Sequence, residues 1–308
     1  MNLPARALLR LRRDFFAWRY RHAARAILFT PPLARGDAPF TLLSMVQPRD
    51  LPSYLVALKS FARAANPQRV VVVCDPAMGD AERAIIKRHV AHAELRRADE
   101  FTHAEMPRGG TWERLCAISL HASEGYVVQL DADTATTGAL PEVLAAIDVG
   151  SGFVIGEAPG QTCVTLDAAS RHARPWLDDP GSPHVIAVAE VALPQVGLPA
   201  GRLYVRGCSG FCGFPRSERM HDELVDFSAR MRRHIGTRWS DWGTEQVASN
   251  YLVANSACAA VLPFPKYATP DAADATTMFW HFIGPLRFLD GRYARVSRML
   301  LPALGAAS

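Results

Sequence analysis

Residues 126–133 have the sequence Tyr-Val-Val-Gln-Leu-Asp-Ala-Asp, and this stretch decides the fold. Its first five residues are large and mostly apolar or β-branched, which predicts a short buried strand. Asp131 and Asp133 follow where that strand should end, and residues i and i+2 of an extended segment point to the same side. Two carboxylates so close repel each other unless a cation or a shared proton relieves them. A divalent metal at the carboxyl end of an α/β strand is well placed to hold a substrate phosphate.

Other uses of an Asp-x-Asp sequence fit these residues less well. An EF-hand loop is excluded, because Ala135 stands where a third ligand is needed and no Glu closes the loop. Phosphatases of the haloacid-dehalogenase type also carry a strand-end Asp-x-Asp, but with Thr or Val two positions after the second Asp and near the start of the chain. Here that position is Ala135, in mid-chain. A chance occurrence of the pair is the remaining alternative.

The chain has 308 residues, of which 49% are hydrophobic and 21% charged, as expected for a globular protein with one large α/β domain or two small ones. No apolar run approaches the length of a membrane span, and no secretory signal is evident at the N-terminus. The scattered cysteines have no CxxC spacing and are expected to be small buried hydrophobes. We therefore expect a cytoplasmic protein.

Positive charge is concentrated at the N-terminus. Residues 1–35 hold eight Arg and one Asp, a net charge of +7, so the remainder of this +4 chain is mildly acidic, which argues against nucleic acid as a partner. Residues 3–29 are predicted to form an amphipathic helix, with Leu8, Leu11, Phe15 and Trp18 at helical spacing. Such a helix can lie peripherally on the anionic inner face of a membrane, or it can pack on the domain.

From residue 40 onward, strands alternate with helices, which predicts a mostly parallel central sheet flanked by helices. Predicted strands are 40–46, 69–74, 126–130 and 153–156, and predicted helices are 51–64, 80–90, 111–121, 217–234 and 243–254. Residues 158–201 are rich in Pro, Gly and Ala and are predicted to contain acceptor loops, and residues 204–214 are predicted to form a strand pair. We divide the chain into an N-terminal extension (1–35) and a single catalytic domain (36–308), with a donor-binding half (about 40–150) and an acceptor and metal-closing half (about 151–290).

Several motifs in a fixed order resemble glycosyltransferase family 8, the glycogenin-like and galactosyltransferase-like enzymes of the GT-A fold. The family has Arg-Leu 17 residues before its Asp-x-Asp, as Arg114-Leu115 stand before Asp131. Its Asn-Ser-Gly corresponds to Cys208-Ser209-Gly210, and its acidic-Gln pair with a following Asn corresponds to Glu245-Gln246 and Asn250. Its His-Phe-x-Gly-x-x-Lys corresponds to residues 281–287, with Arg in place of Lys. The resemblance covers about residues 40–290.

The resemblance implies a nucleotide-sugar site closed by a metal. Asp131, Asp133 and His281 would bind Mn²⁺ or Mg²⁺, and the imidazole favours Mn²⁺. With metal–ligand bonds of roughly 2–2.5 Å, we expect His281 within about 5 Å of the Asp pair. The residues implied in donor binding are Gln47, Asp75, Arg114, Asp131, Ser209, Gly210, Gly284 and Arg287. Competing interpretations are a buried core histidine for His281, a surface salt bridge for Arg114, and tight turns for the glycines.

The resemblance also implies a catalytic role for Glu245 and Gln246 beside the anomeric carbon and the acceptor. Glu245 can equally be a favourable charge at a helix N-terminus. Trp239 and Trp242 can stack on sugar rings or belong to the core. Cys208 departs from the family's Asn, which puts the donor sugar and the stereochemistry in question.

The expected activity is metal-dependent transfer of a sugar, a hexosyltransferase-type reaction, from a nucleotide diphosphate donor to a glycan or lipid-linked acceptor, with retention of configuration and a role in polysaccharide biosynthesis. A non-catalytic protein that binds sugars or a membrane surface on the same scaffold is the alternative, since fold alone does not separate the two. A nucleotidyltransferase that makes sugar nucleotides is disfavoured, because residues 45–50 lack a Gly-rich, Lys-containing loop.

Overall fold

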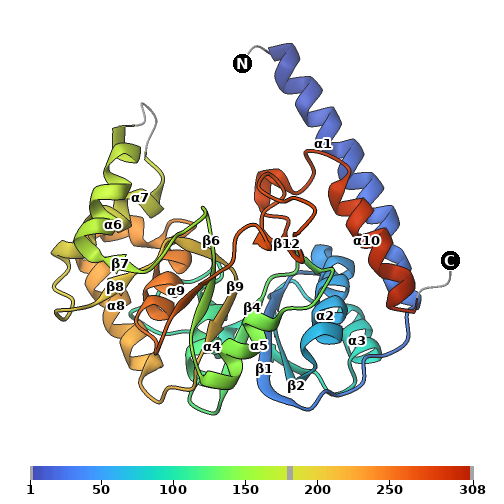
Figure 1. Ribbon diagram of the computed structural model, residues 1–308, viewed down its shortest axis with the longest axis horizontal. Coiled ribbons are helices and arrows are strands. Elements are labelled where there is room, and N and C mark those ends of the chain that lie inside the picture. The colour runs from blue at the N-terminus through green and yellow to red at the C-terminus, as the bar shows by residue number, and fades with distance from the viewer. Residues whose placement is uncertain (1–2, 179–182, 306–308) are drawn as a thin grey trace.

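A mixed sheet of seven strands forms the centre of the computed structural model, which describes residues 3–178 and 183–305 (Figure 1). The strand order is β10-β6-β9-β4-β1-β2-β3. The strands are β1 (Ala38–Val46), β2 (Pro67–Cys74), β3 (Glu94–Arg97), β4 (Tyr126–Leu130), β6 (Phe153–Gly156), β9 (Gly207–Phe214) and β10 (Ala260–Leu262). Neighbouring strands are parallel except where β9 pairs with β4 and β6. The predicted mostly parallel central sheet is therefore confirmed.

Helices cover both faces of this sheet, because successive strand residues point to opposite sides and both sides here are apolar. Leu43 and Val127 belong to the core on one face, and Leu42 and Val128 to the core on the other. The first face is covered by α4 (Trp112–His121), α8 (Met220–Ile235) and α9 (Thr244–Ala254), and the second by α2 (Leu51–Ala65), α3 (Asp80–His89) and α5 (Pro141–Val149). The elements predicted between residues 40 and 130 are present, with bounds within two residues of the prediction.

The segment from residue 158 to 201 contains loops, as predicted, but also helices that were not predicted; its residues 179–182 lie outside the described part. The helices α6 (Leu166–Ala173) and α7 (Val185–Ala192) contact each other, and α7 also contacts α9. Pro and Gly in this segment separate short helices rather than mark one long loop, and its alanines favour helix. The predicted strand pair at 204–214 is also wrong: β8 (Leu203–Tyr204) pairs with β7 (Val164–Thr165), whereas β9 enters the central sheet.

A second, three-stranded sheet joins the C-terminal part of the chain to the end of β4. It consists of β11 (Tyr267–Ala268), β12 (Phe279–His281) and β5 (Thr134–Thr136), in that order. β12 runs antiparallel to β5 with His281 opposite Thr134, and the N–H of Phe282 donates to the carbonyl of Asp133 at 2.8 Å. Residues far apart in sequence are thereby brought to one edge of the central sheet.

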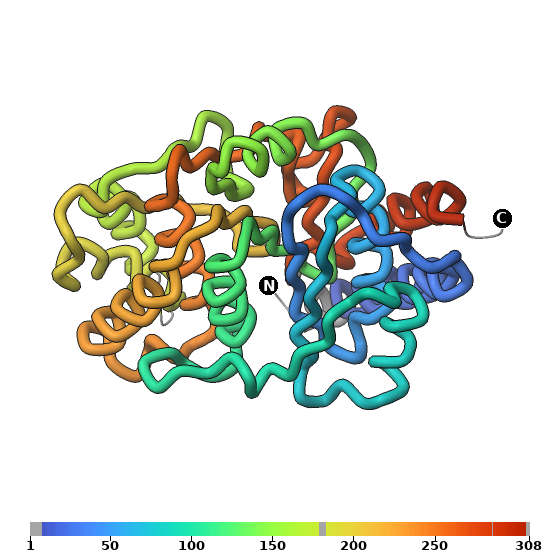
Figure 2. Tube along the Cα trace, turned by 90° about the horizontal axis from the view of Figure 1, so that it is seen from below, coloured from blue at the N-terminus to red at the C-terminus, as the bar shows by residue number. Residues whose placement is uncertain are grey.

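The basic N-terminal segment forms a long helix, α1 (Leu3–Ala24), followed by a 3₁₀ turn at Arg25–Phe29. It runs beside α10 (Arg292–Ala303), as two perpendicular views show (Figures 1 and 2). Tyr20 is buried and stacks on Tyr293 with 3.7 Å between ring centroids. On the outer face, the apolar side chains of Leu8, Leu11, Phe15 and Trp18 are each more than half exposed. Among the described residues, every helix is too short or too polar to cross a bilayer.

Candidate functional site

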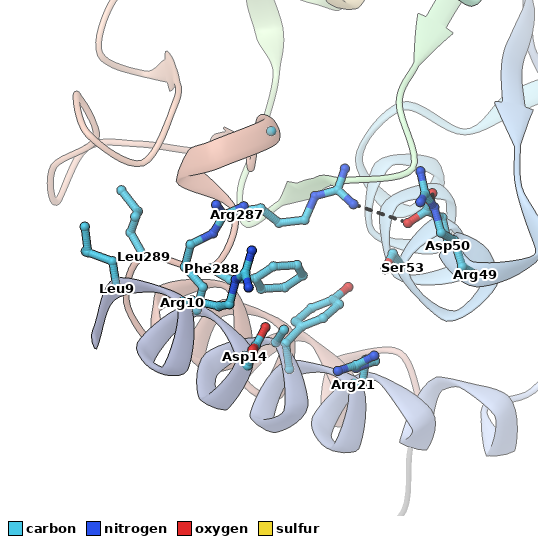
Figure 3. Close-up of a pocket in the computed structure, with 14 residues that line it drawn as sticks. Leu9, Arg10, Asp14, Arg21, Arg49, Asp50, Ser53, Arg287, Phe288 and Leu289 are labelled. Atoms are coloured by element: carbon cyan, nitrogen blue, oxygen red, sulfur yellow. Dashed lines mark hydrogen bonds and ion pairs between the residues drawn. The ribbon is translucent and has the colours of Figure 1, made fainter. Parts of the chain in front are cut away.

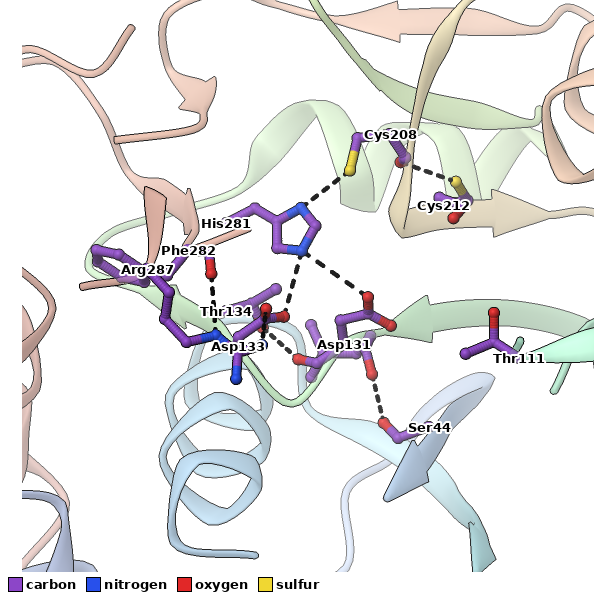
Figure 4. Close-up of polar contacts among 12 residues, drawn as sticks. Ser44, Thr111, Asp131, Asp133, Thr134, Cys208, Cys212, His281, Phe282 and Arg287 are labelled. Atoms are coloured by element: carbon purple, nitrogen blue, oxygen red, sulfur yellow. Dashed lines mark hydrogen bonds and ion pairs between the residues drawn. The ribbon is translucent and has the colours of Figure 1, made fainter. Parts of the chain in front are cut away.

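Asp131, Asp133 and His281 meet at the carboxyl end of β4 (Figure 4). Nε2 of His281 lies 3.2 Å from Oδ1 of Asp133 and 3.8 Å from Oδ2 of Asp131. The turn that carries both carboxylates is fixed from two sides, because the N–H of Asp131 donates to the carbonyl of Gly210 at 2.9 Å and Thr134 Oγ1 donates to the carbonyl of Asp131 at 2.9 Å. The expected closeness of His281 to the Asp pair is confirmed.

The donor set of this cluster suits a divalent metal. One candidate ligand atom from each of the three residues lies within 4.8 Å of the others. Ligands of one ion at bond lengths of roughly 2–2.5 Å lie at most about 4–5 Å apart, so little movement is needed to bind a single ion. The side chain of Asp131 is 25% exposed, which leaves an opening for further oxygen ligands. Two carboxylates and an imidazole fit Mn²⁺, and also Mg²⁺.

Strand β9 fits closely around the ring of His281. A Cβ atom at Gly210 would lie 2.1 Å from Cε1 of His281, so only glycine leaves room for the imidazole. Sγ of Cys208 lies 3.0 Å from Nδ1 of His281. A partner on the second ring nitrogen orients a ligating histidine. Cys208, the departure from the family motif, therefore has a contact that orients a candidate metal ligand.

Arg287 connects the acidic pair to the end of β1. Its guanidinium contacts Asp133, and its Nη1 lies 3.2 Å from Oδ1 of Asp50. Its Nε donates to the carbonyl of Phe282 at 3.2 Å, which orients the side chain. The guanidinium therefore lies where a planar, bidentate donor can meet a phosphate next to the metal ligands.

Arg114 and Glu245 form a buried ion pair on the other side of Asp131. Arg114 contacts Asp131, and its Nη2 lies 3.1 Å from Oε1 of Glu245. Oε2 of Glu245 accepts hydrogen bonds from Thr111 at 3.1 Å and from Ser209 at 3.2 Å. Both side chains of the pair are only 4% exposed. A surface salt bridge is thus excluded for Arg114, whereas Glu245 is both in the first turn of α9 and part of this network.

The pKa values of Asp131 and Asp133 shift in opposite directions because their positive neighbours differ. Burial alone would raise the pKa of Asp133, but the charges of His281 and Arg287 hold the pKa of that carboxyl below its usual range. Burial raises the pKa of Asp131, and the charge of Arg114 offsets this only in part. Burial disfavours charge on His281, yet Cys208 and Asp133 hold its pKa well above the ordinary value. In the absence of a metal, His281, Arg114 and Arg287 balance the two carboxylates.

The remaining predicted residues lie around the cluster with fewer contacts. Gln47 and Asp75 follow neighbouring strands, and the N–H of Asp75 donates to the carbonyl of Val46 at 3.0 Å, so both lie at the same sheet edge. Gln246 is half-buried next to Glu245, and Gly284 is exposed.

Burial and contacts describe three other residues that the sequence analysis names. Asn250 donates to the carbonyl of Gly207 at 2.9 Å and so supports β9 from inside. Trp239 is fully buried and belongs to the core, so it cannot stack on a sugar, whereas Trp242 is 72% exposed.

Two residues of the site were not predicted. Asp50 contacts Arg287, and Thr111 contacts Glu245. A polar residue shortly after a buried strand is a signal that could have found Asp50, because the carboxyl ends of parallel strands meet at one sheet edge. Thr111 has a φ of 73° just before α4, and no sequence pattern indicates that conformation.

Comparisons with known proteins identify the fold. No family model matches the chain, and no curated protein matches its sequence. Among solved structures, the chain is similar to the bifunctional glycosyltransferase WbbM in its apo form, with a TM-score of 0.50 and 14% identity over 90% of this chain and 53% of that chain. It is also similar to an active-site mutant of LgtC, with a TM-score of 0.50 and 11% identity over 87% of this chain and 97% of that chain. This chain therefore spans about half the length of the WbbM chain. Together with the sheet order and the strand-end acidic pair, these similarities show that the chain has the GT-A fold.

Proposed function

We propose that this protein is a metal-dependent glycosyltransferase that moves a sugar from a nucleotide diphosphate donor to an acceptor. The observation that carries the proposal is the cluster of Asp131, Asp133 and His281 at the end of β4, with Arg287 beside it. WbbM is described as a glycosyltransferase and LgtC as a galactosyltransferase, in agreement with this activity. Residues 36–308 would form the catalytic domain.

The diphosphate end of the donor would lie against β12 and the residues that follow it. Asp131, Asp133 and His281 would hold Mn²⁺ or Mg²⁺, which supplies positive charge to the leaving diphosphate when bound. Arg287, which contacts Asp133, would also donate to the diphosphate oxygens. The exposed residue Gly284 accepts a hydrogen bond from the N–H of Arg287, and Gln47 and Asp75 would contact the nucleoside.

The sugar end of the donor would lie between β9 and α9, with retention of configuration as the resemblance implies. Arg114, Ser209 and Gly210 would contact the sugar. Glu245 accepts from three donors and is thus suited to hold Arg114 and Ser209 in position, which makes it a positioning residue. Gln246, half-buried in the same helical turn, is the residue that we place next to the anomeric carbon.

We further propose that α1 binds the surface of an anionic membrane, which would make the protein peripheral to the inner face and the acceptor a lipid-linked or other envelope glycan. The outer face of α1 carries four exposed apolar side chains, and residues 1–35 have a net charge of +7. This charge complements anionic lipid headgroups, at about 1 kcal/mol per basic residue near the surface. The inner face of α1 packs on α10, and its outer face is the one that we propose binds the membrane.

The proposed activity is tested with a panel of nucleotide sugars. Thermal unfolding is measured with each sugar nucleotide, with and without Mn²⁺, and the best ligand is then used in hydrolysis and transfer assays. We expect one nucleotide class to raise the unfolding temperature only when Mn²⁺ is present. Binding without any hydrolysis or transfer would instead support the non-catalytic alternative. If no nucleotide shows metal-dependent binding, the proposed activity is rejected.

A further inference from the structure

A pocket of about 1070 Å³ separates α1 from the loop that carries Arg287 (Figure 3). On the α1 side it is lined by Arg10, Arg13, Tyr20 and Arg21, among others. The facing wall includes Arg49, Asp50 and Arg287. Pockets of roughly 300–1,000 Å³ hold small ligands and cofactors, so a nucleotide fits within this space.

The pocket has a surplus of positive charge. Its lining contains five arginines and two aspartates, Asp14 and Asp50. Arg287 and Arg49 each contact Asp50, whereas within residues 3–178 and 183–305 no ion pair is formed by Arg10, Arg13 or Arg21. Arginine is the side chain best suited to planar, bidentate contact with phosphate oxygens. The chemistry of the lining therefore favours a ligand with phosphate groups.

The pocket shares the side chain of Arg287 with the candidate metal site. Arg287 lines the pocket and at the same time contacts Asp133. Arg49 and Asp50 directly follow β1, and nucleotides bind outside the carboxyl ends of strands in open α/β sheets. A phosphate at Arg287 would thus extend from the metal ligands into the space beneath α1.

We propose that the inner face of α1 is a wall of the donor pocket, in which Arg10, Arg13 and Arg21 contact the phosphates of the bound nucleoside diphosphate. This inference rests on the proposed function, which supplies the nucleotide. Three arginines of α1 that line the same pocket as Arg287 and Asp50 carry it.

The same helix has an outer face directed away from the pocket, and this has a consequence for donor binding. Residues 8–15 of α1 are all exposed, so this half of the helix has little tertiary support. Isolated helical segments of such length are marginal in water. A bilayer that binds the outer face of α1 stabilises the half that carries Arg10 and Arg13. Membrane binding and donor binding are therefore coupled, and each strengthens the other by the same factor.

The first test measures nucleotide binding by isothermal titration calorimetry on the full chain. UDP, GDP and ADP are each titrated with Mn²⁺ present, and the tightest of them is used for Arg10→Gln, Arg13→Gln and Arg21→Gln. Each substitution should weaken binding by about tenfold, the effect of one lost charged hydrogen bond. Arg12→Gln is the matched control, because it removes the same charge from the same helix outside the pocket lining and should stay within about twofold. If all three pocket variants bind like the wild type, the inference is wrong while the proposed function stands; if the wild type binds none of the nucleotides, the proposed function fails first.

The second test adds vesicles of phosphatidylcholine with phosphatidylglycerol. We expect the dissociation constant of the nucleotide to fall by about fivefold or more when vesicles are present, and vesicle co-sedimentation to improve by the same factor when nucleotide is added. The variant Leu11→Ser should lose the vesicle effect and keep its vesicle-free nucleotide affinity. Weaker nucleotide binding in the presence of vesicles would mean that lipid phosphate occupies the pocket, and an unchanged dissociation constant would mean that the helix does not couple the two; either result overturns the inference.

Discussion

At the scale of single residues, Gly210 provides the sharpest test of the candidate metal site. Gly210→Ala would place a Cβ 2.1 Å from the ring of His281, so the ring must move away from the two carboxylates. We expect Mn²⁺ affinity, measured by titration calorimetry, to fall by about 10–100-fold, the usual cost of disturbing a ligand's support. Gly125→Ala is the control, because no atom lies within 4 Å of its added Cβ. Equal Mn²⁺ affinity in both variants would remove His281 from the ligand set.

Asp133 contacts both His281 and Arg287. Asp133→Asn keeps the shape of the side chain but removes the negative charge that His281, Arg287 and a divalent ion would contact. We expect transfer to be abolished and nucleotide binding in Mn²⁺ to weaken, as measured by product formation and calorimetry. Turnover near that of the wild type in the presence of a chelator would show that the metal mechanism is wrong.

At the scale of elements, Arg114 and Glu245 link α4 to α9. Arg114→Met would leave Glu245 buried without its cation, and breaking a buried pair costs about 3–5 kcal/mol. Urea unfolding measures this loss. The double variant Arg114→Met with Glu245→Leu should recover part of the stability, because Glu245 no longer carries an unpaired buried charge, while Asp131 still lacks its contact with Arg114 and activity should stay low. If the single variant were as stable as the wild type, Glu245 would be protonated in the folded protein rather than paired.

The elements also show how far sequence can predict this fold. β1, β2 and β4 were predictable because their apolar runs are short and end at polar residues, which is the pattern of strands buried on both faces. Helices α6 and α7 were missed, because Pro and Gly between them indicate loops when only composition is read. β9 lies inside the predicted segment 204–214, but its partners β4 and β6 were not predicted, since pairing between distant strands leaves no local signal.

The residues of the candidate site also fall into those that the sequence predicts and those that it does not. The Asp131–Asp133 pair was predicted from its place after a buried strand, but a turn and not an extended segment brings the two carboxylates together. His281 was predicted only through the order of its motifs. The sequence analysis did not predict Asp50, Thr111 or the pocket face of α1, because each is defined by a tertiary contact. Asp50 contacts Arg287, Thr111 contacts Glu245, and the face of α1 lines a pocket together with the loop that carries Arg287. The spacing of residues in the sequence does not show which neighbours a side chain of a packed helix faces.

At the scale of the whole molecule, one face of α1 packs on the rest of the protein and the opposite face is exposed to solvent. Deleting the helix would expose the surface that Tyr20 covers, so point substitutions are the better test of membrane binding. Phe15→Ser with Trp18→Ser removes apolar area from the outer face, and we expect co-sedimentation with anionic vesicles at low salt to be largely lost. The urea midpoint should change little, because both side chains are more than half exposed. Undiminished co-sedimentation would contradict the membrane role of this face.

The position of β9 has a consequence for the order in which the chain acquires its structure. β9 lies between β4 and β6 and is antiparallel to both, yet it follows them by a long stretch of sequence. On the ribosome, where synthesis proceeds at about 5–20 residues per second, the facing edges of β4 and β6 have no partner until β9 emerges. Unpaired strand edges are prone to aggregation, and closing such a long loop is slow. The same late strand supplies Ser209, Gly210 and the thiol beside His281. The strand that fills the gap between β4 and β6 thus also supplies part of the site, whereas β10, Glu245 and His281 follow it in the chain. Nascent chains that end before β9 would expose both edges to chaperones.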